Sequence, residues 1–326
     1  VEVQTPFRRM KWDDAMDTYG SDKPDTRFGM EMQNVTELFK NTAFVPFANV
    51  IAEGGTIRAI NAKGLAELLT RKTIDKLVDV AKTYGAKGMA YTRITADSVS
   101  SSFEKNLTEE EKNALHTALN AEVGDVLLLV SDAKRVTACT ALGQVRLEIG
   151  RRANLMDPKQ FNFLWVTDFP LFEYSEEEGR WVAMHHPFTM PTADSLDKVE
   201  TDQGSCYADA YDIVLNGVEL GGGSIRVNDP VLQDRMFKAL GFTEEKARAS
   251  FGFLMDAYRY GAPPHGGMAY GLDRMVMLML GRDSIRDVIA FPKVQNASEL
   301  MSGAPDVVDE KQLRDLSIAY VPQEKN

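Results

Sequence analysis

The chain has 326 residues, of which 44% are hydrophobic and 26% are charged, and its formal net charge is −11. These values are typical of a globular protein of about two domains, and they argue against nucleic-acid binding through bulk positive charge alone. No apolar run approaches the roughly 20 residues that span a bilayer, and the N-terminus lacks a secretory signal. Cys139 and Cys206 lie in no metal-type spacing. We therefore predict a protein of the reducing cytoplasm without a disulfide framework or a zinc site.

The first region, residues 1–29, is polar and rich in turn-forming residues. Its segment Tyr19–Arg27 contains too many Gly, Ser, Asp and Pro residues for a regular element. We expect a loop there, which either lies on the surface or lines a site.

The second region, residues 30–155, changes to short strands and amphipathic helices, which predicts a separate α+β module. We expect two helix starts in it, one capped by Thr70 and one marked by the capping box of Thr108 and Glu111. The other expected elements are a strand at 88–94, a buried strand at 126–130 and a closing helix around 142–149. We find no catalytic constellation in this region.

The third region, residues 156–326, is rich in strands and then helical. The turn signal Asn216–Gly217 predicts a β-hairpin over residues 210–220. We further expect strands at 164–166 and 181–184, and helices from 230 to 241, from 243 to about 260 and from 272 to 281.

The predicted hairpin brings two carboxylates together. A two-residue turn at Asn216–Gly217 pairs Val214 with Glu219, and Asp212 then shares the face of Glu219 because side chains alternate along a strand. Two carboxylates this close repel each other unless a cation lies between them, and their hard oxygen atoms suit Mg²⁺. The alternative is a pair of solvated carboxylates on an exposed sheet.

The residues after this pair favour a ligand site. Gly221–Gly223 form a run of three glycines, whose usual use in a strand is close approach of a ligand to the backbone. Arg226 could hold a carboxylate by two parallel hydrogen bonds. A structural ion pair is the alternative for Arg226.

A second glycine-rich segment, Gly266–Gly271, leads from a strand into a helix. The helix N-terminus favours phosphate, and Arg274 adds a fixed charge in its first turn. Alone this signal is weak, because many such turns are packing devices.

Two adjacent histidines, His185 and His186, precede a proline. Neighbouring residues of an extended segment face opposite ways, so the two rings do not readily chelate one metal. We expect one ring to reach a ligand while the other packs against the protein.

Five stretches, taken in this order, resemble the class II aminoacyl-tRNA synthetases, and specifically the bacterial-type aspartyl family. They are Tyr-Gly-Ser-Asp-Lys-Pro-Asp from Tyr19, Ala-Met-His-His-Pro-Phe-Thr from Ala183, Asn-Gly-Val-Glu-Leu-Gly-Gly-Gly-Ser-Ile-Arg from Asn216, Gly-Leu-Asp-Arg from Gly271, and Arg-Asp-Val-Ile-Ala-Phe-Pro-Lys from Arg286. The likeness runs over nearly the whole chain, and Gly-Leu-Asp-Arg matches the third class II signature motif.

The resemblance implies an α+β fold, in which helices flank the class II antiparallel sheet. Residues 1–29 and 156–326 would belong to the catalytic domain, and residues 30–155 would be an inserted domain of the GAD type. The implied activity is that of an aspartate–tRNA ligase, which uses ATP and Mg²⁺ to form aspartyl-adenylate from L-aspartate and then charges tRNA.

The resemblance also implies roles for individual residues. Asp212 and Glu219 would bind Mg²⁺, and His185 and Arg226 would bind L-aspartate. The expected ATP-binding residues are Glu219, Gly271, Leu272, Asp273 and Arg274, and the expected catalytic residues are Glu219 and Arg274.

The chain also departs from the family pattern. The OB-fold anticodon-binding domain and the first two signature motifs, which supply much of a homodimer interface and an α-phosphate-binding arginine, do not occur in it. We therefore expect a truncated form that by itself shows little or no aminoacylation. Three alternatives stay open: an asparaginyl or lysyl relative, a non-catalytic fragment that binds tRNA or a partner, and an α+β protein whose carboxylates and glycines are structural. Whether the parent charges only aspartate tRNA or also asparagine tRNA stays open too.

Overall fold

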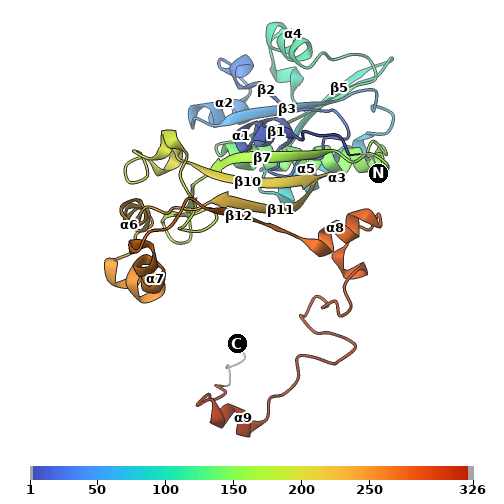
Figure 1. Ribbon diagram of the computed structural model, residues 1–326. Coiled ribbons are helices and arrows are strands. Elements are labelled where there is room, and N and C mark those ends of the chain that lie inside the picture. The colour runs from blue at the N-terminus through green and yellow to red at the C-terminus, as the bar shows by residue number, and fades with distance from the viewer. Residues whose placement is uncertain (1–2, 322–326) are drawn as a thin grey trace. The chain divides into compact units, whose positions relative to one another are not determined.

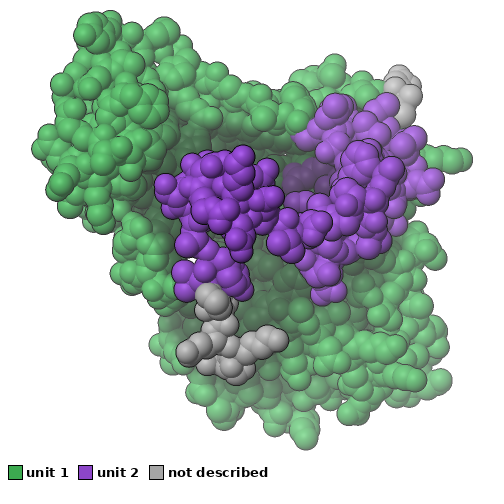
Figure 2. Space-filling model, turned by 90° about the horizontal axis from the view of Figure 1, so that it is seen from below, with its two compact units in different colours: residues 1–270 green, residues 271–326 purple. Residues whose placement is uncertain are grey.

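The structure is a computed structural model that describes residues 3–321. The chain divides into two units, residues 1–270 and residues 271–326, which Figure 2 shows in green and purple. The first unit contains two five-stranded sheets, and the second is mostly short helices joined by loops (Figure 1).

The first sheet carries the predicted hairpin. Its strand order is β1 (Arg8–Lys11), β7 (Phe163–Pro170), β10 (Tyr207–Leu215), β11 (Val218–Ile225) and β12 (Gly266–Tyr270). All neighbours are antiparallel except β1 and β7, which run parallel. Parallel pairing needs a long crossover, and here the whole second sheet lies in the connection between these two strands. The expectation of an antiparallel sheet therefore holds for four of its five strands.

The hairpin forms as its turn residues predict. Asn216 and Gly217 have φ values of 52° and 85°, and positive φ at both central residues is the condition of a type I′ turn. Val214 pairs with Glu219, as expected. A two-stranded β8 (Phe172–Ser175) and β9 (Arg180–Ala183) ribbon precedes the hairpin.

The second sheet lies wholly between residues 33 and 132, within the range predicted for the α+β module. Its order is β2 (Gln33–Asn34), β3 (Thr56–Ala62), β6 (Val126–Asp132), β4 (Ala90–Ile94) and β5 (Val99–Ser101). On one face, a buried apolar cluster includes Phe47 of α2 (Val45–Ala52) and Leu115 of α4 (Glu109–Ala118). The other face packs against the long helix α5 (Arg135–Arg152).

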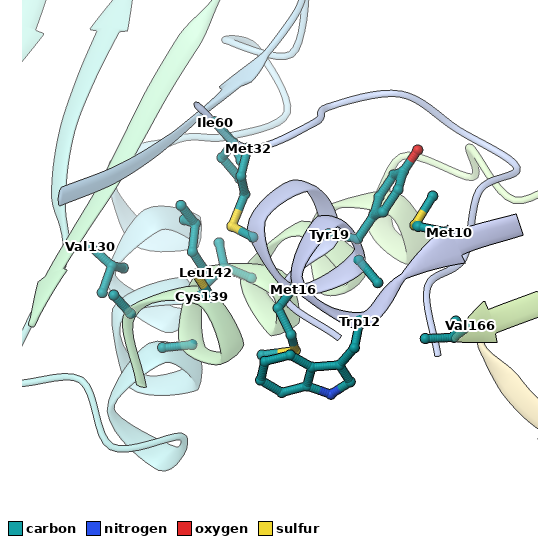
Figure 3. Close-up of a cluster of buried hydrophobic side chains, with 14 of the residues drawn as sticks. Met10, Trp12, Met16, Tyr19, Met32, Ile60, Val130, Cys139, Leu142 and Val166 are labelled. Carbon is teal, nitrogen blue, oxygen red and sulfur yellow. The ribbon is translucent and has the colours of Figure 1, made fainter. Parts of the chain in front are cut away.

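Three helices join the two sheets through one core. Helix α5 contacts α3 (Arg71–Thr83), the second sheet and α1 (Trp12–Tyr19), and α1 contacts β7. Met16, Cys139 and Leu142 lie together in this cluster, which reaches from Val130 in the second sheet to Val166 in the first (Figure 3). Both cysteines are free and buried.

The remaining helices follow the hairpin. In the first unit they are α6 (Pro230–Ala239) and α7 (Glu244–Arg259), capped by the side chains of Asp229 and Thr243. In the second unit they are α8 (Leu272–Met279) and α9 (Glu310–Asp315). Among residues 3–321, no helix is long and apolar enough to cross a membrane.

Two sequence-based expectations are wrong. Residues 8–19 form β1 and α1, although we expected this region to be polar and turn-rich; burial of Trp12, Met16 and Tyr19 on one face stabilises the helix. Thr70 lies at the N-cap position of α3, but its hydroxyl contacts the hydroxyl of Thr73 at 3.2 Å and caps no backbone N–H.

Candidate active site

The two carboxylates of the hairpin share one face of the first sheet. Asp212 pairs with Gly222, and Val214, two residues along the same strand, pairs with Glu219. The register shifts between Ile213 and Val214, which leaves one extra residue on β11 between these pairs. This bulge keeps Glu219 and Gly222 on the same face although they are three residues apart, so the predicted juxtaposition is confirmed by the pairing.

Burial and neighbouring carboxylates dominate the electrostatic environment of Asp212. Burial raises the pKa of Asp212, and the nearby carboxylates of Glu219 and Asp22 raise it further, while Lys23 opposes them; the result is a pKa of about 7. A bound cation would remove this repulsion and restore the ionised carboxylate. The oxygen donors of Asp212 and Glu219 therefore fit Mg²⁺, which commonly takes one or two protein carboxylates and completes its shell with water and phosphate. Within residues 3–321, no group of three or more acidic, His or Cys side chains could hold a metal alone.

The three glycines of β11 make room for protein atoms. A Cβ on Gly222 would lie 2.0 Å from Oδ1 of Asp212, so the carboxylate lies over this glycine. A Cβ on Gly221 would lie 2.2 Å from the carbonyl oxygen of Ala269, and one on Gly223 would lie 1.9 Å from that of Gly267. From the sequence alone we expect this glycine run to admit a ligand close to the backbone. In the structure it permits both the close packing of β12 and the position of the Asp212 side chain.

Arg226 lies against His186. Its Nη1 is 3.3 Å from Nδ1 of His186, and the same ring nitrogen accepts a hydrogen bond from the backbone N–H of Phe188 at 3.2 Å. An acceptor Nδ1 requires the proton on Nε2, so Arg226 also donates to this atom. Burial and the charge of Arg226 lower the pKa of His186 to about 4, which keeps the ring neutral. The second histidine thus holds the guanidinium, a contact that the sequence did not predict.

His185 lies in a bend that follows β9, not in the extended segment expected from the sequence. It packs edge-on against Phe169, with ring centroids 5.2 Å apart. Burial lowers the pKa of His185, and Arg226 lowers it too, while Asp22, Glu173 and Glu219 oppose this shift. His185 is therefore within the electrostatic reach of both Glu219 and Arg226, the residues with which we grouped it.

The loop of residues 20–30 adds two charged groups, Asp22 and Lys23, that sequence patterns alone do not assign to the site. Asp22 acts on both Asp212 and His185, and Lys23 acts on Asp212. The available signal was the Ser-Asp-Lys-Pro-Asp run itself, because a loop of this composition can line a site as easily as it can lie in solvent.

The predicted strand-to-helix turn is present. Strand β12 ends at Tyr270, and Gly271 is the N-cap residue of α8 and, as a glycine, supplies no side-chain cap to its backbone N–H groups. Leu272, Asp273 and Arg274 form the first turn of α8 in the second unit. Their roles toward ATP stay predictions.

The chain is similar to known proteins over nearly its whole length. A family described as tRNA synthetases class II (D, K and N) matches residues 1–295. The chain is 57% identical over 324 residues to the aspartate–tRNA ligase of Ruminiclostridium cellulolyticum, covering 99% of this chain and 54% of that protein. It is 51% identical over 326 residues to the aspartate–tRNA(Asp/Asn) ligase of a Geobacillus species, covering 100% of this chain and 55% of that protein. The chain thus spans about half the length of the curated relatives it matches.

Solved structures also match in part. An aspartyl-tRNA synthetase from Entamoeba histolytica is 26% identical, with a TM-score of 0.33, and the match covers 48% of this chain and 26% of that one.

Proposed function

Because the chain belongs to the class II tRNA synthetases (D, K and N), we propose that it is the catalytic region of an aspartate–tRNA ligase. In this reaction the α-carboxylate of L-aspartate attacks the α-phosphate of ATP, which gives aspartyl-adenylate and releases pyrophosphate. The terminal ribose hydroxyl of tRNA then takes the aspartyl group from the adenylate.

One observation carries the proposal: the hairpin presents Asp212 and Glu219 on one face, and its second strand leads directly to Arg226. The acidic pair would hold Mg²⁺, which when bound neutralises phosphate charge as a Lewis acid. The raised pKa of Asp212 supports this assignment, because a bound cation would offset the repulsion between Asp212 and its neighbouring carboxylates.

Arg226 would bind the side-chain carboxylate of aspartate. Its guanidinium is met by a neutral ring nitrogen of His186, which orients it without neutralising it. A planar guanidinium matches a carboxylate by two parallel hydrogen bonds, and a neutral amide in the same place would leave its charge unpaired. We therefore expect aspartate to be favoured over asparagine. His185, which interacts electrostatically with Arg226, would contact the same substrate.

The helix start at Gly271–Arg274 would receive ATP. Its uncapped N–H groups and the charge of Arg274 favour phosphate. In this assignment Glu219 and Arg274 are the catalytic residues, since they would stabilise charge on the reacting phosphates and need form no covalent intermediate.

The remaining assignments follow from family membership. Residues 30–155 would be a GAD-like domain, and residues 1–29 and 156–326 the catalytic domain. The tRNA partner would be that of aspartate, and the name of the Geobacillus relative includes asparagine tRNA as well. A cytoplasmic location and a homodimeric parent belong to the same proposal.

ATP–pyrophosphate exchange tests this function. The chain would be measured alone and extended to the length of its relatives, with aspartate, asparagine or lysine as the amino acid. We expect the extended protein to exchange with aspartate only, the Arg226→Leu variant to lose most of that exchange, and the chain alone to show little. Exchange with asparagine but not aspartate would refute the substrate assignment.

A further inference from the structure

Helix α5 contains a buried charge that the proposed reaction does not use. Arg146 is only 1% exposed, and it is the largest of the fully buried side chains among the described residues. Burial lowers its pKa to about 10, so the guanidinium stays charged at neutral pH. A buried charge lowers stability unless it is fully hydrogen-bonded. The hydrogen-bond partners of Arg146 therefore indicate which segment this side chain holds in place.

Among residues 3–321, the hydrogen-bond partners of the Arg146 side chain all lie in one loop. Its Nη2 donates to the carbonyl oxygens of Asp25 at 3.1 Å, Phe28 at 2.7 Å and Gly29 at 2.8 Å. Its Nε donates to the carbonyl oxygens of Gly29 at 3.1 Å and Met30 at 3.2 Å. The guanidinium also lies over the ring of Phe28, 3.9 Å from its centroid. Arg146 therefore organises residues 25–30 through their backbone.

The face of α5 that carries Arg146 is shaped for close approach of this loop. A Cβ on Gly143 would lie 2.5 Å from the carbonyl oxygen of Tyr19, and a Cβ on Gly150 would lie 2.7 Å from the ring of Phe28. Gly20, with φ at 69°, would meet the carbonyl oxygen of Cys139 at 2.1 Å. Residues 143, 146 and 150 fall on one side of the helix, so both ends of the loop rest on α5.

The opposite side of the loop is joined to the hairpin that carries the acidic pair. Asn162 donates to the carbonyl oxygen of Thr26 at 3.1 Å, and its backbone N–H donates to Oδ1 of Asn216 at 3.0 Å. Gly217 lies against Asp25, where an added Cβ would be 3.3 Å from the Asp25 Cβ. The loop is thus held between α5 and the hairpin turn.

We propose that Arg146 is a positioning residue for the acidic pair: from α5 it fixes the loop of residues 20–30 against the hairpin turn and so places Asp22 and Lys23 beside Asp212. This inference rests on the proposed function only for the use of the pair as a metal site. The loop clamp itself rests on the contacts of Arg146, Asn162 and Gly217. Through this clamp, helix α5, which packs on the second sheet, determines which charged side chains lie near the acidic pair of the first sheet.

Hydrogen exchange tests the clamp directly. In Arg146→Lys, which keeps the charge but loses the forked donors, amides of residues 20–32 should exchange about tenfold faster, whereas those of α4 should not change. Arg152→Lys is the matched control, because Arg152 lies on the same helix but pairs with Glu148 near the surface. If Arg146→Lys fails to fold, Asn162→Ala loosens the loop from the hairpin side and should give the same local increase. Unchanged exchange of residues 20–32 in a folded variant would refute the proposed clamp, whether or not the chain binds a metal ion.

A double-mutant cycle read by Mn²⁺ binding, followed by electron paramagnetic resonance on the chain alone, tests the effect on the pair. Lys23→Met removes a positive charge near Asp212 and should tighten Mn²⁺ binding about threefold or more. In the Arg146→Lys background this gain should fall below about twofold, because the loop no longer holds Lys23 in place. A full gain in that background refutes the positioning role. Absence of Mn²⁺ binding by the wild-type chain refutes the metal site of the proposed function and leaves the exchange experiment to decide the clamp.

Discussion

Strand β6 of the second sheet and strand β11 of the first sheet differ in the kind of residue that they carry. In β6 the residues Val126–Val130 are all fully buried, so apolar composition, strand propensity and packing agree. In β11 a strand of similar length carries three consecutive glycines and Glu219, which faces a second carboxylate across the hairpin. Sequences that break local rules in this way usually do so at functional sites. The comparison therefore separates a region built for stability from a region built to hold charge.

The largest expected effect tests this separation with one substitution in β6 and one in β11. Leu128→Ala in β6 removes a fully buried side chain and should lower the free energy of unfolding by about 3 kcal/mol. It should leave Mn²⁺ affinity unchanged. Gly222→Ala in β11 should cost only about 1 kcal/mol, because the flexible carboxylate of Asp212 can move away from the new methyl group. It should nevertheless weaken Mn²⁺ binding about tenfold, which corresponds to 1.4 kcal/mol.

Urea unfolding and Mn²⁺ titration of the same two variants check this prediction. The separation fails if Leu128→Ala weakens the metal site as much as Gly222→Ala does, because the two sheets would then act as one unit.

A smaller effect concerns how the free energy of unfolding depends on pH. The pKa of Asp212 is about 7 in the folded chain and 3.8 in the unfolded one, so between these values the folded state binds the extra proton. Stability without metal should therefore fall as pH rises from about 4 to about 7. After allowance for the partial exposure of this carboxylate, the loss is about 2 kcal/mol.

Asp212→Asn should remove this slope and be more stable than the wild type at pH 8 in the presence of a chelator. Asp209→Asn, an exposed position of the same strand, is the control and should keep the slope. Equal slopes in all three proteins, measured by urea unfolding from pH 4 to 8, would show that repulsion at Asp212 is not the cause.

The same contrast explains what could be predicted from sequence. The β6 strand, the Asn216–Gly217 turn and the pairing of Val214 with Glu219 depend on short-range patterns, and all are confirmed. Helix α1 was missed because Asp13, Asp14 and Asp17 obscure an apolar stripe that becomes evident only when it packs against α5 and β7.

The charge environment of the site could not be predicted in the same way. Asp22 and Lys23 reach Asp212 because Arg146, distant in sequence, holds their loop in place. The spacing of Gly143, Arg146 and Gly150 on one side of a helix was the only local sign of this contact. The roles of Gly271–Arg274 depend on how the second unit meets ATP, and local pattern gives only their place at a helix start.

The smallest expected effect concerns two helix starts that look alike in sequence but differ in structure. The hydroxyl of Thr108 accepts a hydrogen bond from the backbone N–H of Glu111 at 3.2 Å, and Glu111 accepts one from the N–H of Thr108 at 2.8 Å. The hydroxyl of Thr70 contacts that of Thr73 and, among the described residues, caps no backbone N–H. Thr108→Ala should therefore cost about 1 kcal/mol, whereas Thr70→Ala should cost less than about 0.5 kcal/mol. Urea unfolding of both variants decides the point: equal losses would mean that the capping box of α4 contributes no more than an ordinary surface threonine, and that second-sheet stability comes from its buried strands alone.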